Sequence, residues 1–145
     1  MSTTVQDVLK TKAPEVITTS PGATVYDAVA LMARHQIGAL VVLRDDKIAG
    51  IVTERDYARK IILKGRDSRE TPVGEIMTQK VTCVAADQSV DDCMALMTSE
   101  RFRHLPVLED TQLVGIVSIG DVVKAVLAEK EFVIEELERY IVGGR

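Results

Sequence analysis

The sequence contains one pattern twice: residues 16–56 align with residues 81–121 at a constant offset of 65 residues and without a gap. The identical pairs are Val16/Val81, Val25/Val90, Asp27/Asp92, Ala30/Ala95, Leu31/Leu96, Met32/Met97, Leu40/Leu105, Val42/Val107, Leu43/Leu108, Asp45/Asp110, Gly50/Gly115, Ile51/Ile116, Val52/Val117 and Asp56/Asp121. Two copies at this spacing do not form an open solenoid, whose repeats are typically about 20–50 residues long. Two units that each leave an apolar face uncovered are expected to pack on each other, with paired clefts that suit a ligand.

The bulk composition is that of a soluble globular domain. The chain has 145 residues, of which 46% are hydrophobic and 28% are charged, so it can bury a core of ordinary size. The longest apolar runs, such as Ile37–Leu43, are too short to cross a bilayer. The N-terminus has no basic segment followed by an apolar stretch, so we expect mature sequence of a cytoplasmic protein.

The chemistry-bearing residues exclude several classes of site. The only cysteines are Cys83 and Cys93 and the only histidines are His35 and His104, so no metal is expected. The formal net charge is −4, and aromatic residues make up 3% of the chain with no Trp. Nucleic acid is therefore an improbable general partner, because its binding usually requires a basic surplus or stacking platforms.

Each repeat is predicted to form helix, strand, helix, strand, strand and helix. In the first repeat these elements are Val5–Lys10, Glu15–Thr18, a helix from Thr24, Ala39–Leu43, Ile48–Thr53 and Glu54–Leu63. In the second repeat they are Val73–Met77, Val81–Val84, Ser89–Glu100, His104–Leu108, Gln112–Ser118 and Gly120–Lys130. The assignments follow apolar periodicity and turn residues.

The predicted fold class is therefore α/β (α+β), with two repeats that are each a small mixed sheet flanked by helices and that pack with pseudo-two-fold symmetry. We expect the first repeat at residues 5–64, a linker at 65–72, the second repeat at 73–130 and a C-terminal helix at 131–143. This additional helix has an apolar face and no counterpart in the first repeat, so a contact with a partner subunit is one expectation for it.

The most chemically suggestive segment ends each repeat. Thr53 and Ser118 each end a strand, and Asp56 and Asp121 follow three residues later in the first turn of a helix. Free N–H groups at a helix start suit a phosphate, and a carboxylate can accept hydrogen bonds from ribose hydroxyls. The same spacing also suits simple helix capping. Spacing alone leaves both interpretations open.

The order of elements, the repeated Gly-apolar-apolar-Thr/Ser-x-x-Asp segment and the tandem arrangement resemble a pair of CBS domains, also called a Bateman module. The segments Thr-Glu-Arg-Asp-Tyr, Arg-His-Leu-Pro-Val and Ser-Ile-Gly-Asp are similar to those of small stand-alone bacterial CBS-pair proteins. The resemblance implies a module that binds AMP, ADP, ATP, NAD or S-adenosylmethionine in clefts between the repeats. It assigns Asp56 and Asp121 to ribose hydroxyls, and Thr53 and Ser118 to ribose or phosphate. It also places short strands against the adenine edge, at Val16, Thr18, Val81 and Cys83.

The two clefts are not expected to be equal. Arg103 and His104 stand where the first repeat has Gly38 and Ala39, and by resemblance they are phosphate-contacting positions. The planar guanidinium of arginine suits phosphate oxygens. The neighbouring Arg101 adds to this cationic patch, although an exposed solvated face is the alternative for both arginines.

A second difference lies beside the aspartates. Arg55 precedes Asp56, whereas its counterpart Gly120 permits close approach of a ligand to the backbone. These differences predict that one cleft holds phosphates more strongly than the other.

The leading hypothesis is a non-catalytic adenosine-nucleotide sensor that acts as a homodimer and modulates a partner protein. The sequence contains no activated nucleophile constellation and no Walker or dinucleotide-fingerprint loop, so we expect no enzymatic activity. The alternatives are a protein-interaction scaffold that needs no ligand, and RNA binding through the patch from Arg101 to His104.

Overall fold

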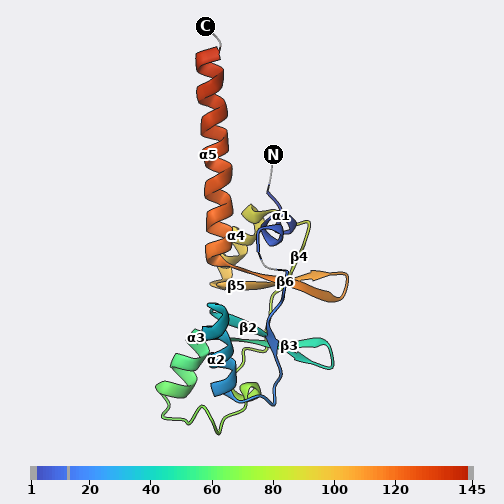
Figure 1. Cartoon of the computed structure of the whole chain (residues 1–145), viewed down its shortest axis with the longest axis vertical. Helices are drawn as coiled ribbons and strands as arrows, with labels where there is room; N and C mark the ends of the chain where they lie inside the picture. The colour runs from blue at the N-terminus through green and yellow to red at the C-terminus, as the bar shows by residue number, and fades with distance from the viewer. Residues whose placement is uncertain (1–2, 13, 144–145) are drawn as a thin grey trace. The chain divides into compact units, whose positions relative to one another are not determined.

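The computed structural model describes residues 3–12 and 14–143, which divide into two compact units. One, the central unit, consists of residues 17–81. The other, the terminal unit, consists of the described parts of residues 1–16 and 82–145. Figure 1 labels the helices α1–α5 and most of the strands. No helix among the described residues is long and apolar enough to span a membrane.

The central unit carries the sheet of the first repeat. Its elements are β1 (Thr18–Thr19), α2 (Val25–His35), β2 (Ala39–Arg44), β3 (Lys47–Thr53), α3 (Glu54–Tyr57), the π-helical turn η1 (Ala58–Ile62) and the 3₁₀ turn η2 (Val73–Glu75). The Thr24 hydroxyl accepts a hydrogen bond from the Asp27 N–H and so caps α2. The β2–β3 hairpin turns at Asp45 and Asp46, which both have positive φ, as a tight hairpin requires.

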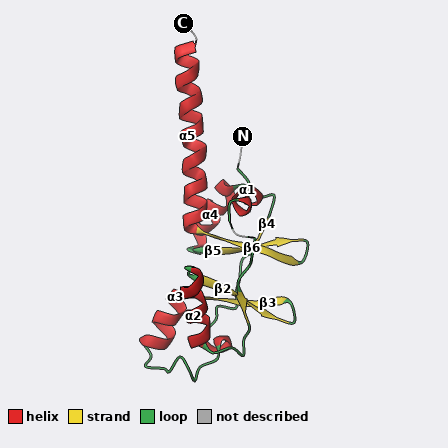
Figure 2. Ribbon diagram, in the orientation of Figure 1, coloured by secondary structure: helices red, strands yellow, loops and turns green. Residues whose placement is uncertain are grey.

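The terminal unit carries the sheet of the second repeat. Its elements are α1 (Val5–Lys10), β4 (Val84–Ala85), α4 (Val90–Glu100), β5 (His104–Glu109), β6 (Gln112–Ser118) and α5 (Ile119–Gly143). Ser89 caps α4 as Thr24 caps α2. Figure 2 shows that each unit combines a strand hairpin with helices.

The two sheets have the same topology and register. The strand orders are β1-β2-β3 and β4-β5-β6, in which the first pair is parallel and the second antiparallel. Even the irregularity is repeated: the hairpins shift register between Val42 and Leu43 and between Val107 and Leu108. The predicted fold class, two small mixed sheets with flanking helices and a C-terminal helix, is confirmed.

Each lead-in segment packs with the sheet of the other repeat. In the terminal unit, Val5 and Val8 of α1 are buried in one core with Val107 and Val117. The core of the central unit joins the sheet to η2 and the residues after it, and consists of Val25, Ala28, Met32, Leu40, Val42, Val52, Ile61, Val73, Ile76 and Met77. The terminal unit is therefore not continuous in sequence, whereas the central unit is a single stretch of the chain.

The repeated glycine of the Gly-apolar-apolar segment makes room for this packing. A Cβ at Gly50 would lie 2.7 Å from the Thr78 carbonyl oxygen, and a Cβ at Gly115 would lie 2.6 Å from a Leu9 methyl carbon. Thr78 and Ile51 also exchange backbone hydrogen bonds of 2.8 and 2.9 Å. The glycine therefore serves the approach of the lead-in to the last strand of each sheet.

The C-terminal region differs from the prediction. Residues 119–143 form one helix, α5, so the separate helices predicted at 120–130 and 131–142 were wrong. The reason is that no Gly or Pro interrupts the sequence between Asp121 and Val142. In the first repeat the predicted helix from Glu54 to Leu63 exists, but its second half is a π-helical turn in which the Leu63 N–H donates to the Ala58 carbonyl.

Candidate ligand-binding site

The N-terminus of α3 is capped by Thr53 and Asp56. The Thr53 N–H donates to Asp56 Oδ2 over 3.0 Å, and the Asp56 N–H donates to Thr53 Oγ1 over 3.1 Å. Lys60 Nζ lies 3.0 Å from Asp56 Oδ1, and the Thr78 hydroxyl lies 3.4 Å from the same oxygen. Both oxygens of Asp56 therefore have partners in the central unit, and the side chain is only 10% exposed.

Lys60 is held by more than the carboxylate. Its ammonium also donates to the Ile76 carbonyl over 2.7 Å, so it ties η1 to the segment after η2. The pair Asp56–Lys60 follows the i, i+4 spacing that brings side chains together on a helix. This spacing is visible in the sequence, although the sequence analysis did not identify Lys60.

The start of α5 has the same cap. The Ser118 N–H donates to Asp121 Oδ2 over 2.9 Å, and the Asp121 N–H donates to Ser118 Oγ over 3.1 Å. The capping interpretation of both Thr53/Asp56 and Ser118/Asp121 is thus confirmed, while the ligand interpretation remains a prediction.

The charge partner of Asp121 differs from that of Asp56. Lys12 Nζ, from the segment after α1, lies 2.7 Å from Asp121 Oδ2 and donates to the Ile116 carbonyl over 2.8 Å. Among the described residues, no group donates to Asp121 Oδ1, and the side chain is 25% exposed. Asp121 therefore keeps one accessible carboxylate oxygen, whereas Asp56 does not.

Arg103 and His104 are joined to the start of α5 through their backbones. The Ile119 N–H at the start of α5 donates to the Arg103 carbonyl over 2.8 Å, and His104 is paired with Ser118 across β5 and β6. The equivalent bond in the central unit runs from the Glu54 N–H to the Gly38 carbonyl over 3.0 Å, and Ala39 pairs with Thr53. At these positions the backbone bond and the strand pairing are equivalent in the two units, and the side chains differ.

The pKa values of Asp121 and His104 are both shifted by burial and by neighbouring groups. Burial by itself raises the pKa of Asp121, but the hydrogen bonds from Lys12 and Ser118 outweigh it and hold that pKa below its ordinary value. Burial lowers the pKa of His104, and the charges of Lys12 and Arg103 lower it further against the opposite effect of Asp121. His104 is therefore neutral at neutral pH, beside two cations and one carboxylate.

The remaining predicted positions are dispersed. Arg101 is exposed and ends α4 in the left-handed conformation with φ 60. Arg55 and Gly120 are exposed in the first turns of α3 and α5, and a Cβ at Gly120 would make only an ordinary contact with Ser118. The four predicted adenine-edge residues, Val16, Thr18, Val81 and Cys83, are all half-buried.

Both cysteines behave as packing residues. Burial raises the pKa of the Cys83 thiol and that of the Cys93 thiol, and the charge of Asp92 adds to the second shift. A raised pKa disfavours the reactive thiolate. Within the described part of the chain, no group of three or more His, Cys, Asp or Glu residues is arranged to hold a metal ion.

Sequence reasoning missed Lys12. It lies 109 residues from Asp121 in sequence, so no local spacing connects the two. Only the packing of α1 with the sheet of the second repeat brings them together.

A chain built of two equivalent sheet-and-helix repeats, each with a hydroxyl–carboxylate pair at a helix start, is a tandem-repeat module of mixed α/β class. The model of the CBS domain matches residues 5–63 and 73–128. The chain belongs to the CBS-domain family, as a CBS pair.

The chain is similar over most of its length to known CBS-domain proteins. The "CBS domain-containing protein CBSX3, mitochondrial" of Arabidopsis thaliana is 46% identical over 99% of this chain and 74% of its own length. The structure of a CBS-domain protein from Burkholderia ambifaria superposes with a TM-score of 0.84 and 55% identity over 87% of this chain and 95% of that one. A hexameric CBS-CP12 protein from bloom-forming cyanobacteria superposes with a TM-score of 0.80 and 31% identity over 100% of this chain and 86% of that one.

Proposed function

We propose that this CBS pair is a non-catalytic regulatory module that binds an adenosine-containing ligand: AMP, ADP, ATP, NAD or S-adenosylmethionine. The observation that carries the proposal is the group of side chains at the start of α5. There Asp121 has a carboxylate oxygen available to a ribose hydroxyl, and Lys12 pairs with its other oxygen. The backbones of Arg103 and His104 are joined to the same helix start, and their side chains are proposed to supply donors to phosphate. Membership of the CBS-domain family supports the same assignment.

The start of α5 is proposed as the stronger of two unequal sites. At the start of α3, Lys60 and Thr78 already engage Asp56, and Gly38 supplies no charge where the other repeat has Arg103. A ribose there would have to displace an internal ion pair from a buried carboxylate, which costs free energy. A ligand at the start of α5 can bind Asp121 Oδ1 without displacing an internal ion pair.

Binding is proposed to regulate a partner protein, and the chain is proposed to act as a homodimer. Regulation requires that the ligand favour one of two conformations. Self-association is supported by the hexameric cyanobacterial CBS-CP12 protein, which aligns with this chain over its whole length.

A ligand panel tests the proposal. The melting temperature and calorimetric titration of the native chain are measured with AMP, ATP, NAD and S-adenosylmethionine. A ligand present at about a hundred times its dissociation constant adds about 2.7 kcal/mol to the free energy of unfolding. Absence of any shift or binding heat with all four compounds would refute the function.

A matched pair of variants assigns the site. Asp121→Ala removes the carboxylate proposed for ribose. Asp92→Ala is the matched control, because the Asp92 N–H donates to the capping Ser89 of α4 as the Asp121 N–H donates to Ser118. We expect loss of binding in the first variant and native affinity in the second. Asp56→Ala, if folded, should retain most of the affinity, because its carboxylate is occupied internally.

A further inference from the structure

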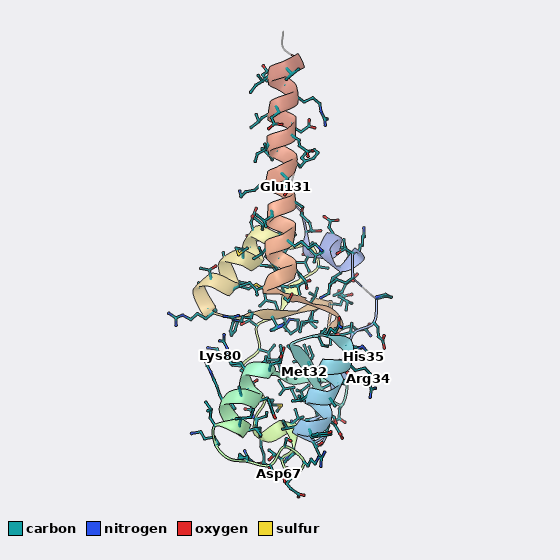
Figure 3. All side chains as sticks on the ribbon, turned by 60° about the vertical axis from the view of Figure 1, so that its left-hand side comes forward. Met32, Arg34, His35, Asp67, Lys80 and Glu131 are labelled. Atoms are coloured by element: carbon teal, nitrogen blue, oxygen red, sulfur yellow. The ribbon has the colours of Figure 1, made fainter. Side chains whose placement is uncertain are left out.

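The second half of α5 leaves the core of the terminal unit. Val122 is 1% exposed and packs in that core together with Ala125 and Val126. A 2.6 Å hydrogen bond from the Thr3 N–H to Glu129 Oε1 joins α5 to the N-terminal segment. All residues from Lys130 to Val142 are exposed. Figure 1 shows α5 continuing past α1 and α4, and Figure 3 labels Glu131 near the point where it does so.

This exposed half is apolar on one side. Leu127, Ile134, Leu137 and Ile141 are 54–64% exposed, and together with Lys130 they follow alternating steps of four and three residues. That spacing places them in one stripe along the helix, as in the seam of a coiled coil. Val133 and Tyr140 widen one flank of the stripe, whereas Glu131 and Glu138 line the other flank.

We propose that this stripe is the contact surface of the homodimer, on which α5 of a second copy lies antiparallel. In that arrangement Leu127 lies against Leu137 of the other copy, and Lys130 lies against Ile134 of the other copy. The inference rests on the homodimer of the proposed function and identifies its contact surface. It does not depend on any ligand.

The charges favour a second copy and the antiparallel direction. Lys124, Glu131 and Glu138 occupy the same flank at intervals of seven residues. An antiparallel pair centred near Glu131 therefore brings Lys124 opposite Glu138 of the other copy, and the symmetry repeats this opposite-charge pair. The two copies of Glu131 face each other at the centre, so two opposite-charge pairs stand against one like-charge pair. A parallel pair would instead place the two Lys130 ammonium groups side by side in the seam.

Sedimentation equilibrium on the full chain tests the surface. The double variant Ile134→Glu and Leu137→Glu places carboxylates in the stripe, and we expect the dimer dissociation constant to rise roughly thirty-fold or more. Because both side chains are exposed, the melting temperature extrapolated to low concentration and the helix content should stay native. Phe132→Glu is the matched control: Phe132 is 52% exposed on the same helix but off the stripe, so its dimer should be native.

Cysteine cross-linking tests the direction. Under mild oxidation, Glu131→Cys should form a covalent dimer in an antiparallel pair, whereas Lys130→Cys should do so in a parallel one. A native dimer that survives Ile134→Glu with Leu137→Glu overturns the proposed surface but keeps the homodimer. A chain that stays monomeric at all concentrations overturns both. Efficient cross-linking only through Lys130→Cys overturns the antiparallel arrangement.

Discussion

Lys12 and Asp121 form an ion pair of 2.7 Å although 109 residues separate them in sequence. The equivalent carboxylate, Asp56, is paired over 3.0 Å with Lys60, only four residues away. The carboxylate and its helix cap are therefore common to both repeats, but the lysine that pairs with the carboxylate comes from a different part of the fold in each. Asp56 is paired with a cation of its own helical segment, and Asp121 is paired with a cation of the N-terminal segment.

Lys60→Ala should destabilise the central unit. The change leaves the carboxylate of Asp56, whose side chain is 10% exposed, without its cation, and it leaves the Ile76 carbonyl without the 2.7 Å bond. We expect a loss of about 1–2 kcal/mol in the free energy of unfolding, discounted because Lys60 itself is 43% exposed. Urea titration measures the loss.

Arg59→Ala provides the control for that experiment, since Arg59 is exposed in the same π-helical turn. It should change the free energy of unfolding by less than about 0.5 kcal/mol. Equal effects of the two substitutions would mean that the ion pair to Asp56 contributes nothing.

Arg103→Ala should change ligand preference rather than remove binding. Its guanidinium is proposed to contact phosphate, and a hydrogen bond between charged groups contributes about 1.5–3 kcal/mol. Affinity for a phosphorylated adenosine ligand should therefore fall by roughly ten-fold or more, while affinity for adenosine is unchanged. Calorimetry measures the affinities for ATP and for adenosine in the native chain and in the variant. Arg34→Ala, at an exposed arginine of α2, is the control. A parallel loss for both compounds would contradict the phosphate role.

Much of the fold is predictable from the sequence because it depends on local patterns. Alternating apolar residues, the tight turn at Asp45 and Asp46, and the capping hydroxyls of Thr24 and Ser89 place the strands and helices close to where they lie. The contact of Lys12 with Asp121 is not predictable in this way, because it follows from the packing of α1 with the sheet of the other repeat.

The helix boundaries show where local patterns are insufficient. Neither Lys130 nor Glu131 is a helix-breaking residue, so nothing in the local sequence separates the two predicted helices. The π-helical turn at Ala58–Ile62 has an apolar pattern similar to that of an α-helix, so periodicity does not distinguish them.

His104 should make the fold less stable in weak acid. Its pKa in the folded chain lies below the ordinary 6.5, chiefly because of burial, so the unfolded chain binds the proton more readily. The contribution of His104 to the free energy of unfolding is therefore fully present above about pH 6.5 and is lost as the pH falls below it. The pKa of Asp121 is lowered from 3.8, so its contribution is lost only in stronger acid.

Melting temperatures at pH 7.5 and 5.5 separate the two histidines. His104→Ala should reduce the loss of stability between these pH values, whereas His35→Ala, at an exposed position at the end of α2, should leave it unchanged. A native pH dependence in the His104 variant would exclude this histidine as its cause.

Substitution of the glycine in each repeat should have unequal effects. In Gly50→Ala the new Cβ would lie 2.7 Å from the backbone oxygen of Thr78, which is fixed by its two hydrogen bonds with Ile51. In Gly115→Ala the nearest atom, at 2.6 Å, is a methyl carbon of Leu9, which can move by rotation of its side chain. Overpacking in a core costs about 1–3 kcal/mol, and we expect Gly50→Ala near the upper limit and Gly115→Ala near the lower one. Gly22→Ala is the control, because no atom lies within 4 Å of its Cβ. Urea unfolding of the three variants measures the order, and a smaller loss for Gly50→Ala than for Gly115→Ala would contradict the rigid contact with Thr78.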